Sequence, residues 1–448
     1  MKIKFLGAAG TVTGSGYVVT SESGSSILVD LGMFQGPSAI EKLNYQKIDY
    51  DLSKLSGAVL THAHLDHCGR IPVLLSHGFK SQIWMTSPTA DLTEISLFDS
   101  AKIARMDGRE ILYDRKLVEK TLKAFRKTSY GTTILVGHFG VTFRDAGHIL
   151  GSASIEIEDK SASGQVKKSV FSGDLGNPDM DLLPSAAHIH SSDVVVMEST
   201  YGGRLHPVES PQDVLAREVN AAESSGSTLL MPTFSLEKTQ EILHWFKFLK
   251  QKGLVKSQTP VFLDSPMAVK ATRVYENYSY MFSSQIQQEF KISNPFDFPG
   301  LTMIESRETR GSLEKSSGAK VIMAGSGMMM GGRILMHAQR YLTNRSARLL
   351  ILGYQGEETL GREILEGARS VNIDGATITI KATVSHTESM SSHADQGQLL
   401  SWLKNISGTK HVVLTHGDDT PRKALGKIIE TDFGTKVSLP ILNQEITL

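Results

Sequence analysis

The feature that most constrains the fold is a run of four strand-then-helix patterns in the middle of the chain. The four pairs are 228–231 with 236–249, 260–263 with 266–282, 320–324 with 328–341, and 349–352 with 359–368. Strands that alternate with helices are joined by right-handed crossovers and form a parallel sheet. Residues 207–377 are therefore expected to form an α/β domain of their own.

Short strand patterns lie on both sides of this block. Before it, apolar runs separated by turn residues are typical of hairpins, as at 3–6, 17–19 and 26–30. Further strand patterns fall at 58–60, 132–136, 141–143, 154–157, 169–172 and 194–197, with a helical stretch at 88–125, and strands resume at 377–380 and 412–415. We therefore predict an α+β / α/β chain in which residues 1–206 and 378–448 form one mixed-sheet domain around an inserted domain, 207–377.

Composition narrows the class of protein. The chain of 448 residues has 47 Lys plus Arg and 47 Asp plus Glu, so its net charge gives no global attraction to nucleic acid or anionic lipid, although a local basic groove is still allowed. The single cysteine, Cys68, rules out an internal disulfide framework and a cysteine zinc finger. No apolar run reaches about 18 residues and no signal-peptide core is present, so we expect a cytoplasmic protein without a membrane-spanning helix.

A histidine cluster, THAHLDH at residues 61–67, directly follows an apolar strand pattern. Imidazole and carboxylate groups at this density are suitable ligands for Zn²⁺. Side chains of an extended chain repeat with period two, so His62 and His64 are expected to point the same way. Asp66 and His67 follow one turn later. The sequence therefore predicts one metal ion held by the first pair and a second ion held by the second pair.

Three more residues of ligand type, His148, Asp174 and His416, lie where strand patterns run into glycine-rich turns. Taken alone, each is equally compatible with a turn residue that bonds the local backbone. Together with the cluster, they complete a two-metal set in which Asp174 is the bridging carboxylate. Two ions about 3.5–4 Å apart activate water and stabilise charge on phosphorus or a carbonyl, so we expect a hydrolase with two Zn²⁺. Ligand type leaves manganese as an alternative.

These motifs, in this order, resemble the metallo-β-lactamase superfamily. Residues 62–67 match its HxHxDH motif, and His148 and Asp174 match its next two motifs. Asp30, which follows a strand pattern, matches an upstream aspartate that orients metal ligands in that superfamily. The resemblance implies an αββα sandwich for the domain outside the inserted block.

The resemblance narrows to the β-CASP nucleases, which include the cleavage-and-polyadenylation endonuclease and its compact bacterial and archaeal relatives. ESTYG at 198–202 matches the first motif private to this group, SHAD at 392–395 the second, and His416 the third. The resemblance implies that His393 is the general acid, oriented by Glu198, and that Asp66 belongs to the catalytic set. With a histidine at the third motif, the chain resembles the RNA-acting members of the group, whereas DNA-acting members tend to carry valine at that position.

The function implied by this resemblance is hydrolysis of single-stranded RNA, as an endonuclease, a 5′-to-3′ exonuclease or both. The alternatives are a thioester or lactone hydrolase of the same superfamily, a DNA-acting β-CASP nuclease, and a non-catalytic RNA-binding protein. The sequence does not name the RNA, and it leaves open whether the chain is a monomer or a homodimer.

Loops after the strand patterns of the inserted block carry serines and basic residues. Helix starts bind phosphate, and ligands favour the carboxyl ends of parallel strands, although ordinary strand-to-helix turns also favour serine and glycine. We expect RNA-backbone contacts from Ser235, Lys238, Ser265, Ser326 and Arg333. A second HxH pair, His188 and His190, matches no family motif and is interpreted as exposed loop residues.

Overall fold

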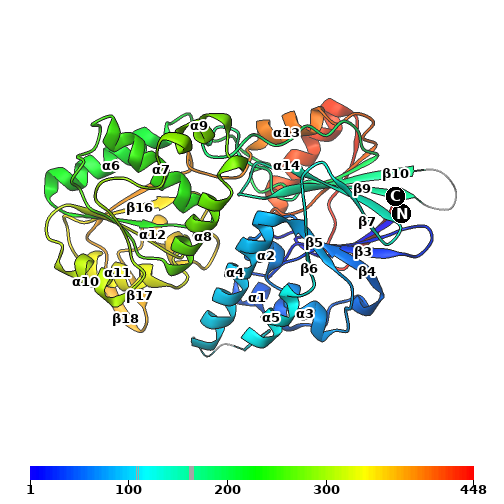
Figure 1. The fold of residues 1–448 in the computed structure, drawn as a ribbon, viewed down its shortest axis with the longest axis horizontal. Helices are drawn as coiled ribbons and strands as arrows, with labels where there is room; N and C mark the ends of the chain where they lie inside the picture. Colours follow the sequence, from blue (N-terminus) through cyan, green and yellow to red (C-terminus); the bar gives the residue numbers. More distant parts are fainter. Residues whose placement is uncertain (107, 109, 161–165) are drawn as a thin grey trace. The chain divides into compact units, whose positions relative to one another are not determined.

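The computed structural model of the protein describes residues 1–448 except 107, 109 and 161–165. The chain divides into two compact units (Figure 1). Unit 1 contains Met1–Asp179, Leu183–Leu205 and His393–Leu448, and unit 2 contains Met180–Leu182 and His206–Ser392. Among the described residues, no helix combines the length and the apolar character needed to cross a membrane.

The first sheet of unit 1 has the strand order β22-β1-β2-β3-β4-β5-β6. Its strands are β1 Lys2–Gly7, β2 Gly16–Thr20, β3 Ser26–Leu31, β4 Leu55–Val59, β5 Ile83–Thr86, β6 Phe125–Thr128 and β22 Glu445–Thr447. β1, β2 and β3 are antiparallel neighbours, whereas β3 to β6 run parallel. The hairpins predicted for the start of the chain are thus confirmed.

The second sheet of unit 1 has the order β21-β20-β11-β10-β9-β8-β7. Its strands are β7 Thr133–Val136, β8 Phe139–Asp145, β9 Ala153–Lys160, β10 Val166–Phe171, β11 Val194–Met197, β20 His411–Leu414 and β21 Lys436–Ser438. β7 to β10 are antiparallel, and β10, β11, β20 and β21 are parallel. The C-terminal segment therefore contributes strands to both sheets of unit 1.

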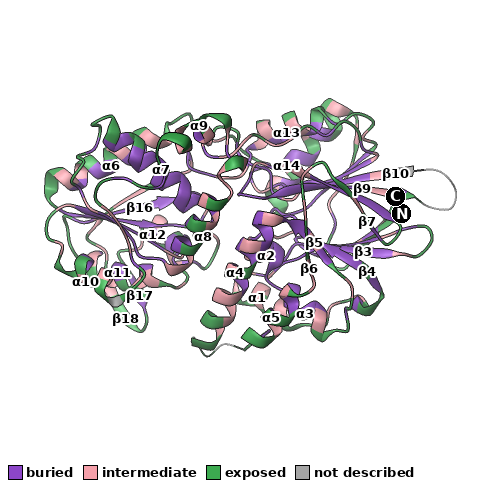
Figure 2. Cartoon of the chain, viewed as in Figure 1, coloured by how far each residue is buried: buried purple, intermediate pink, exposed green. Residues whose placement is uncertain are grey.

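The two sheets of unit 1 pack face to face, with helices on both outer faces (Figure 1). One apolar cluster joins Phe5 and Val29 of the first sheet to Phe143 and Phe171 of the second. The helices are α1 Ser38–Glu41, α2 Leu65–Cys68, α3 Ile71–Ser76, α4 Ser87–Met106, α5 Arg115–Leu122, α13 Gln396–Lys404 and α14 Asp419–Ile428. β3 is buried along its whole length, as a strand covered on both faces must be (Figure 2). The αββα sandwich is confirmed.

Unit 2 is built on a parallel sheet of order β14-β13-β15-β12-β16-β19. Its strands are β12 Thr228–Pro232, β13 Val261–Leu263, β14 Leu301–Met303, β15 Lys320–Ala324, β16 Arg348–Leu352 and β19 Thr383–Thr387. Its helices are α6 Pro211–Ser225, α7 Lys238–Gln251, α8 Pro266–Asn277, α9 Ser284–Ile292, α10 Arg307–Lys315, α11 Arg333–Tyr341 and α12 Leu360–Leu365. All four predicted strands form, and their parallel pairing is as expected.

Residues 378–392 belong to unit 2, although they were expected in 378–448, the segment that completes the first domain. β19 lies beside β16 in the parallel sheet and extends it by one strand. Before it, β17 Ser370–Ile373 and β18 Ala376–Thr379 form an antiparallel hairpin. The turn residues Asp374 and Gly375 have φ of 51° and 82°, as a two-residue hairpin turn of type I′ requires. This Asp-Gly turn is the signal that the strand pattern at 377–380 continues the inserted block.

Candidate metal centre

Two glycines, Gly32 and Gly176, allow backbone segments to lie close enough together for the ligand-type side chains to converge. A Cβ on Gly32 would lie 1.6 Å from the carbonyl oxygen of Asp66, so only glycine after β3 admits the turn that starts α2. A Cβ on Gly176 would lie 1.8 Å from the carbonyl oxygen of Gly147, which brings the loop of His148 against the loop of Asp174. Ligand-type side chains from four separate loops thereby meet beside the ends of β4, β8, β10 and β20.

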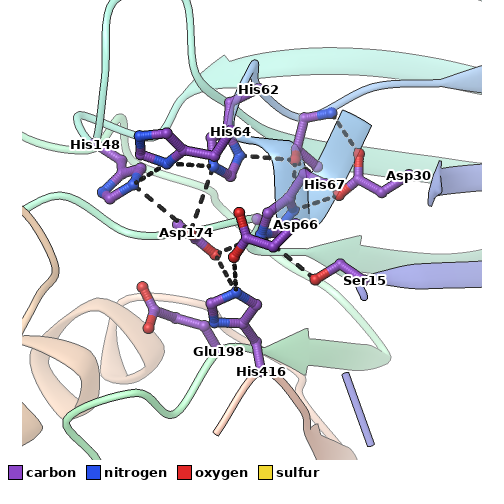
Figure 3. Close-up of polar contacts among 12 residues, drawn as sticks. Ser15, Asp30, His62, His64, Asp66, His67, His148, Asp174, Glu198 and His416 are labelled. Atoms are coloured by element: carbon purple, nitrogen blue, oxygen red, sulfur yellow. Dashed lines mark hydrogen bonds and ion pairs between the residues drawn. The ribbon is translucent and has the colours of Figure 1, made fainter. Parts of the chain in front are cut away.

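The first group of converging side chains contains His62, His64, His148 and Asp174. The Nδ1 atom of His64 lies 3.1 Å from Nε2 of His62 and 3.2 Å from Nε2 of His148 (Figure 3). The Oδ2 atom of Asp174 lies 3.4 Å from Nε2 of His62 and 3.6 Å from Nε2 of His148. His62 and His64 therefore face one point, as their i, i+2 spacing predicted.

The second group contains Asp66, His67, Asp174 and His416. The Nε2 atom of His416 lies 3.2 Å from Oδ2 of Asp66 and 3.6 Å from Oδ1 of Asp174 (Figure 3). The Nε2 atom of His67 lies 3.1 Å from Oδ1 of Asp174. Asp174 thus turns one carboxylate oxygen toward each group, and it is the residue that the two groups share.

In three of these rings, one nitrogen points away from the cluster and lies within hydrogen-bond distance of a neighbouring side chain. This contact fixes which ring nitrogen faces the cluster. Nδ1 of His67 donates to Oδ2 of Asp30 at 2.8 Å, and the Thr61 hydroxyl donates to the same oxygen, also at 2.8 Å. The Thr61 oxygen then lies 3.1 Å from Nδ1 of His62. Nδ1 of His416 lies 3.1 Å from the Thr200 hydroxyl. In His62, His67 and His416, Nε2 is consequently the nitrogen presented to the cluster.

Burial and neighbouring charges together set the charge states in the cluster. Burial lowers the pKa of His62 to about 3 and that of His64 to about 4, and it lowers the pKa of His148 well below its usual value. Burial alone would raise the pKa of Asp174, but the neighbouring His416, His67 and His62 hold it well below its usual range. Burial would also lower the pKa of His67 and His416, but Asp174 and the other nearby carboxylates outweigh it and raise the pKa of both rings. Neutral imidazoles and ionised carboxylates are the forms that bind a metal ion, so binding at the second group would displace protons from these two rings.

The donor set fits divalent cations of the zinc type. Within the described residues, Oδ1 of the buried Asp174 accepts no hydrogen bond. Three imidazole nitrogens converge at 3.1–3.2 Å, and the lone pairs of neutral rings repel one another at that separation unless a cation or a proton lies between them. A divalent ion in each group would satisfy both the carboxylate and the rings.

A third group joins Asp174 to Glu198 and His393. Nδ1 of His393 lies 3.2 Å from Oε1 of Glu198, which also accepts the backbone N–H of Leu175 at 2.7 Å. Burial lowers the pKa of His393, but the charge and the hydrogen bond of Glu198 outweigh it and raise the pKa to about 9. The His393 ring stays partly exposed and lies 4.5 Å from the His148 ring, centroid to centroid. A protonated imidazole is thereby held beside the first group.

The residues expected to contact RNA lie at the carboxyl ends of the unit 2 strands. The Ser235 and Ser265 hydroxyls are 3.3 Å apart, and a Cβ on Gly325 would lie 3.7 Å from each of them. The Ser326 hydroxyl accepts the backbone N–H of Met330 at 2.9 Å, and the half-buried Arg333 forms an ion pair with the buried Asp264. Ser235, Ser265 and Ser326 thus closely follow strands at this edge, and the Arg333 side chain reaches Asp264, which follows β13.

Lys238 was expected to contact RNA, but the structure buries it. It is 5% exposed, and burial lowers its pKa to about 8 despite the nearby Glu241 and Glu237. α7 is buried on nearly all sides, because the helix packs into the core of unit 2. The Lys238 ammonium is therefore not presented to solvent in this structure.

Four supporting residues did not emerge from the sequence. Thr61 and Thr200 hold ring nitrogens, Ser15 lies 3.4 Å from Nε2 of His67, and Asp264 anchors Arg333. Thr61 and Thr200 adjoin ligand-type motifs, and this adjacency is a signal that could have found them. Ser15 is distant in sequence from His67, and its backbone N–H reaches the neighbouring carbonyl oxygen of Asp66 at 2.9 Å, a contact that no local sequence pattern indicates.

A two-sheet sandwich with an HxHxDH turn at a strand end, interrupted by a parallel-sheet unit, defines the class of metallo-β-lactamase-fold hydrolases. Residues 9–205 match the family described as "Metallo-beta-lactamase superfamily", residues 239–364 the "Beta-Casp domain", and residues 377–440 the "Zn-dependent metallo-hydrolase RNA specificity domain".

The chain is 36% identical over 441 residues to Ribonuclease TTHA0252 of Thermus thermophilus, covering 98% of each chain. It is 28% identical to the transcription termination factor FttA of Methanocaldococcus jannaschii, over 94% of this chain and 67% of that protein. A crystal structure of a protein of unknown function from Enterococcus faecalis matches the fold with a TM-score of 0.58 and 13% identity, over 100% of this chain and 99% of that one. The protein belongs to the metallo-β-lactamase superfamily, in the branch that carries a Beta-Casp domain.

Proposed function

We propose that the protein is a metal-dependent ribonuclease that hydrolyses phosphodiester bonds of single-stranded RNA with two zinc ions. The observation that carries this proposal is the position of Asp174 between the two ligand groups, with the Glu198–His393 pair beside them. Similarity to a protein named ribonuclease and the match to an RNA specificity domain support RNA as the substrate. The single, buried cysteine supports a reducing, cytoplasmic location.

Each of the two groups of side chains would bind one ion. His62, His64 and His148 would hold one ion, Asp66, His67 and His416 would hold the other, and Asp174 would contact both. When bound, the two ions supply Lewis acidity that stabilises the negative charge developing around phosphorus. Asp30 holds the His67 ring and, through the Thr61 hydroxyl, the His62 ring in the orientation that this binding needs.

His393 is assigned the role of general acid. Its Nδ1 faces Glu198, so its Nε2 is the nitrogen that delivers a proton to the leaving 3′-oxygen. The high pKa that Glu198 confers keeps the ring protonated at neutral pH. Water attacks phosphorus, the bond between phosphorus and the 3′-oxygen breaks, and the proton from His393 goes to that oxygen, so one product carries a 5′-phosphate and the other a 3′-hydroxyl.

RNA-backbone contacts are assigned to Ser235, Ser265, Ser326 and Arg333. The three serines follow neighbouring parallel strands, where ligands of α/β sheets bind. The Arg333 guanidinium is half-buried and held by Asp264, which limits its freedom before it meets a phosphate. Lys238 is left out of this set because it is buried.

The experiment that tests the proposal incubates zinc-loaded protein with end-labelled single-stranded RNA and maps the product ends. We expect cleavage that yields 5′-phosphate and 3′-hydroxyl ends, and loss of cleavage in Asp66→Ala. A matched control is His138→Ala, which removes an exposed histidine from the β7–β8 turn and should leave cleavage unchanged. Hydrolysis of a thioester without RNA cleavage, or cleavage of single-stranded DNA alone, would overturn the proposal.

A further inference from the structure

A second pair of histidines in unit 1 lies outside the groups described above. His188 and His190 are both exposed, and Ile189 between them is buried. This alternation is the pattern of an extended segment, in which side chains at i and i+2 project from the same face. The two imidazoles consequently stand next to each other in solvent.

The arrangement of the two rings is close to that of a pair in the metal centre. The centroids of His188 and His190 are 4.8 Å apart, with an angle of 88° between the ring planes. His62 and His64, the HxH pair of the first ligand group, have centroids 4.9 Å apart and an angle of 82°. Both pairs thus combine the same sequence spacing with the same edge-to-face arrangement.

The backbone that carries the exposed pair is fixed on both sides. The carbonyl oxygen of His190 accepts the Ser407 backbone N–H at 3.0 Å and the Ser407 hydroxyl at 2.7 Å. The backbone N–H of Ala187 donates to the carbonyl oxygen of Asp145 at 2.7 Å. With Ile189 anchored in the core beneath them, the two side chains keep their common face without metal, which reduces the entropy lost on chelation.

We propose that His188 and His190 form a two-histidine site for a divalent transition-metal ion of the Ni²⁺, Cu²⁺ or Zn²⁺ class, distinct from the buried centre. Imidazole is a good ligand for these ions, and water completes the coordination at an exposed site. Because both ligands are exposed, the ion exchanges readily with solvent. Purified protein should then bind one more ion of this class than the buried centre holds.

The test titrates Ni²⁺ into full-length protein whose buried centre is already zinc-loaded, with isothermal calorimetry and with metal analysis after dialysis at fixed free Ni²⁺. We expect one additional Ni²⁺ per chain without loss of zinc. Loss of an outer-shell partner alone costs about 10–100-fold in metal affinity, so His188→Ala or His190→Ala should weaken the additional site by at least about tenfold. The double variant should lose it.

His138→Ala is the matched control, since it removes one exposed histidine away from the pair, and it should leave the additional site intact. RNA cleavage by the double variant should equal that of the wild type, so the result is independent of the proposed ribonuclease function. Absence of additional Ni²⁺ binding in the wild type, or equal additional binding in the double variant, would overturn the proposal.

Discussion

At the scale of single residues, the centre depends on carboxylates that neighbour histidines. Three of these carboxylates, Asp30, Asp174 and Glu198, are each at most 1% exposed. In each, a carboxylate oxygen lies within 3.2 Å of a histidine nitrogen. Motif spacing alone predicted that His62 and His64 share a face. It did not predict that Thr61 links Asp30 to His62. Thr61 adjoins the histidine cluster in sequence, but Asp30, to which its hydroxyl donates, lies 31 residues away.

Removing the His393 ring should lower kcat much more than it weakens RNA binding. General acid catalysis contributes roughly 10²–10⁴-fold in rate, so His393→Ala should lose about that factor while the Kd for RNA stays within twofold or so. Glu198→Gln keeps the ring but removes the charge that raises its pKa, so the basic limb of the pH–rate profile should shift to lower pH. Single-turnover cleavage and filter binding measure both effects, and an unchanged rate in His393→Ala would contradict the assignment.

Asp30→Asn should weaken metal binding while the ligands remain in place. An amide accepts the His67 N–H and the Thr61 hydroxyl less strongly than a carboxylate does, and loss of such a partner costs about 10–100-fold in metal affinity. Zinc competition against a fluorescent chelator measures this change. Wild-type affinity in this variant would show that Asp30 does not orient the ligands.

At the scale of secondary-structure elements, Asp264 joins β13 to two helices of unit 2. It is fully buried. Its Oδ2 atom accepts the Nε2–H of His337 at 2.9 Å, and it pairs with Arg333 of α11 and with Arg310 of α10. Burial raises the pKa of Asp264, but the hydrogen bonds of His337 and Arg333 outweigh it and lower the pKa below its usual 3.8.

A carboxylate with a depressed pKa contributes stability above its unfolded pKa and loses it as the pH falls through the folded value. Asp264→Asn should therefore cost about 1–3 kcal/mol near neutral pH, because the half-buried Arg333 and Arg310 lose their carboxylate partner. The difference from the wild type should shrink as the pH drops below 3.8, the ordinary pKa of this carboxyl. Urea unfolding followed by circular dichroism at several pH values checks this, and a difference that grows toward low pH would contradict it.

Arg333→Ala should reduce the salt dependence of RNA binding. Each neutralised phosphate of a single strand contributes about −0.7 to the slope of log K against log salt, so the slope should become shallower by about that amount. Arg345 is the matched control, since it is exposed and precedes β16 at the amino ends of the strands. Equal slopes for wild type, Arg333→Ala and Arg345→Ala would remove Arg333 from the RNA contacts.

Some strands and helices could be predicted from the sequence, whereas the bounds or burial of others could not. Alternating strands and helices indicated the parallel sheet, and β15 forms over the predicted residues, 320–324. α11 begins at Arg333 rather than 328, because Gly332 adopts a φ of 75° that ends any helix running into it. β19 and the burial of Lys238 depend on pairing and packing between distant segments, which no local pattern contains.

At the scale of the whole molecule, ions bound only by the folded chain stabilise it. The seven ligand-type side chains of the two groups come from segments between residues 62 and 416, so unfolding separates them. Ligand at 100 times its Kd stabilises a protein by about 2.7 kcal/mol, and treatment with EDTA should lower the melting temperature and abolish cleavage together. Added zinc should restore both, and an unchanged melting temperature after complete metal removal would contradict this link between binding and folding.

The most direct test of the central claim is an anomalous-difference map, collected at the zinc edge from crystals of the zinc-loaded protein. We expect two peaks, one on each side of the Asp174 carboxylate, about 3.5–4 Å apart. One peak lies among His62, His64 and His148, and the other lies among Asp66, His67 and His416. A map without anomalous density there, with His148, Asp174 and His416 turned away from one another, would contradict the account.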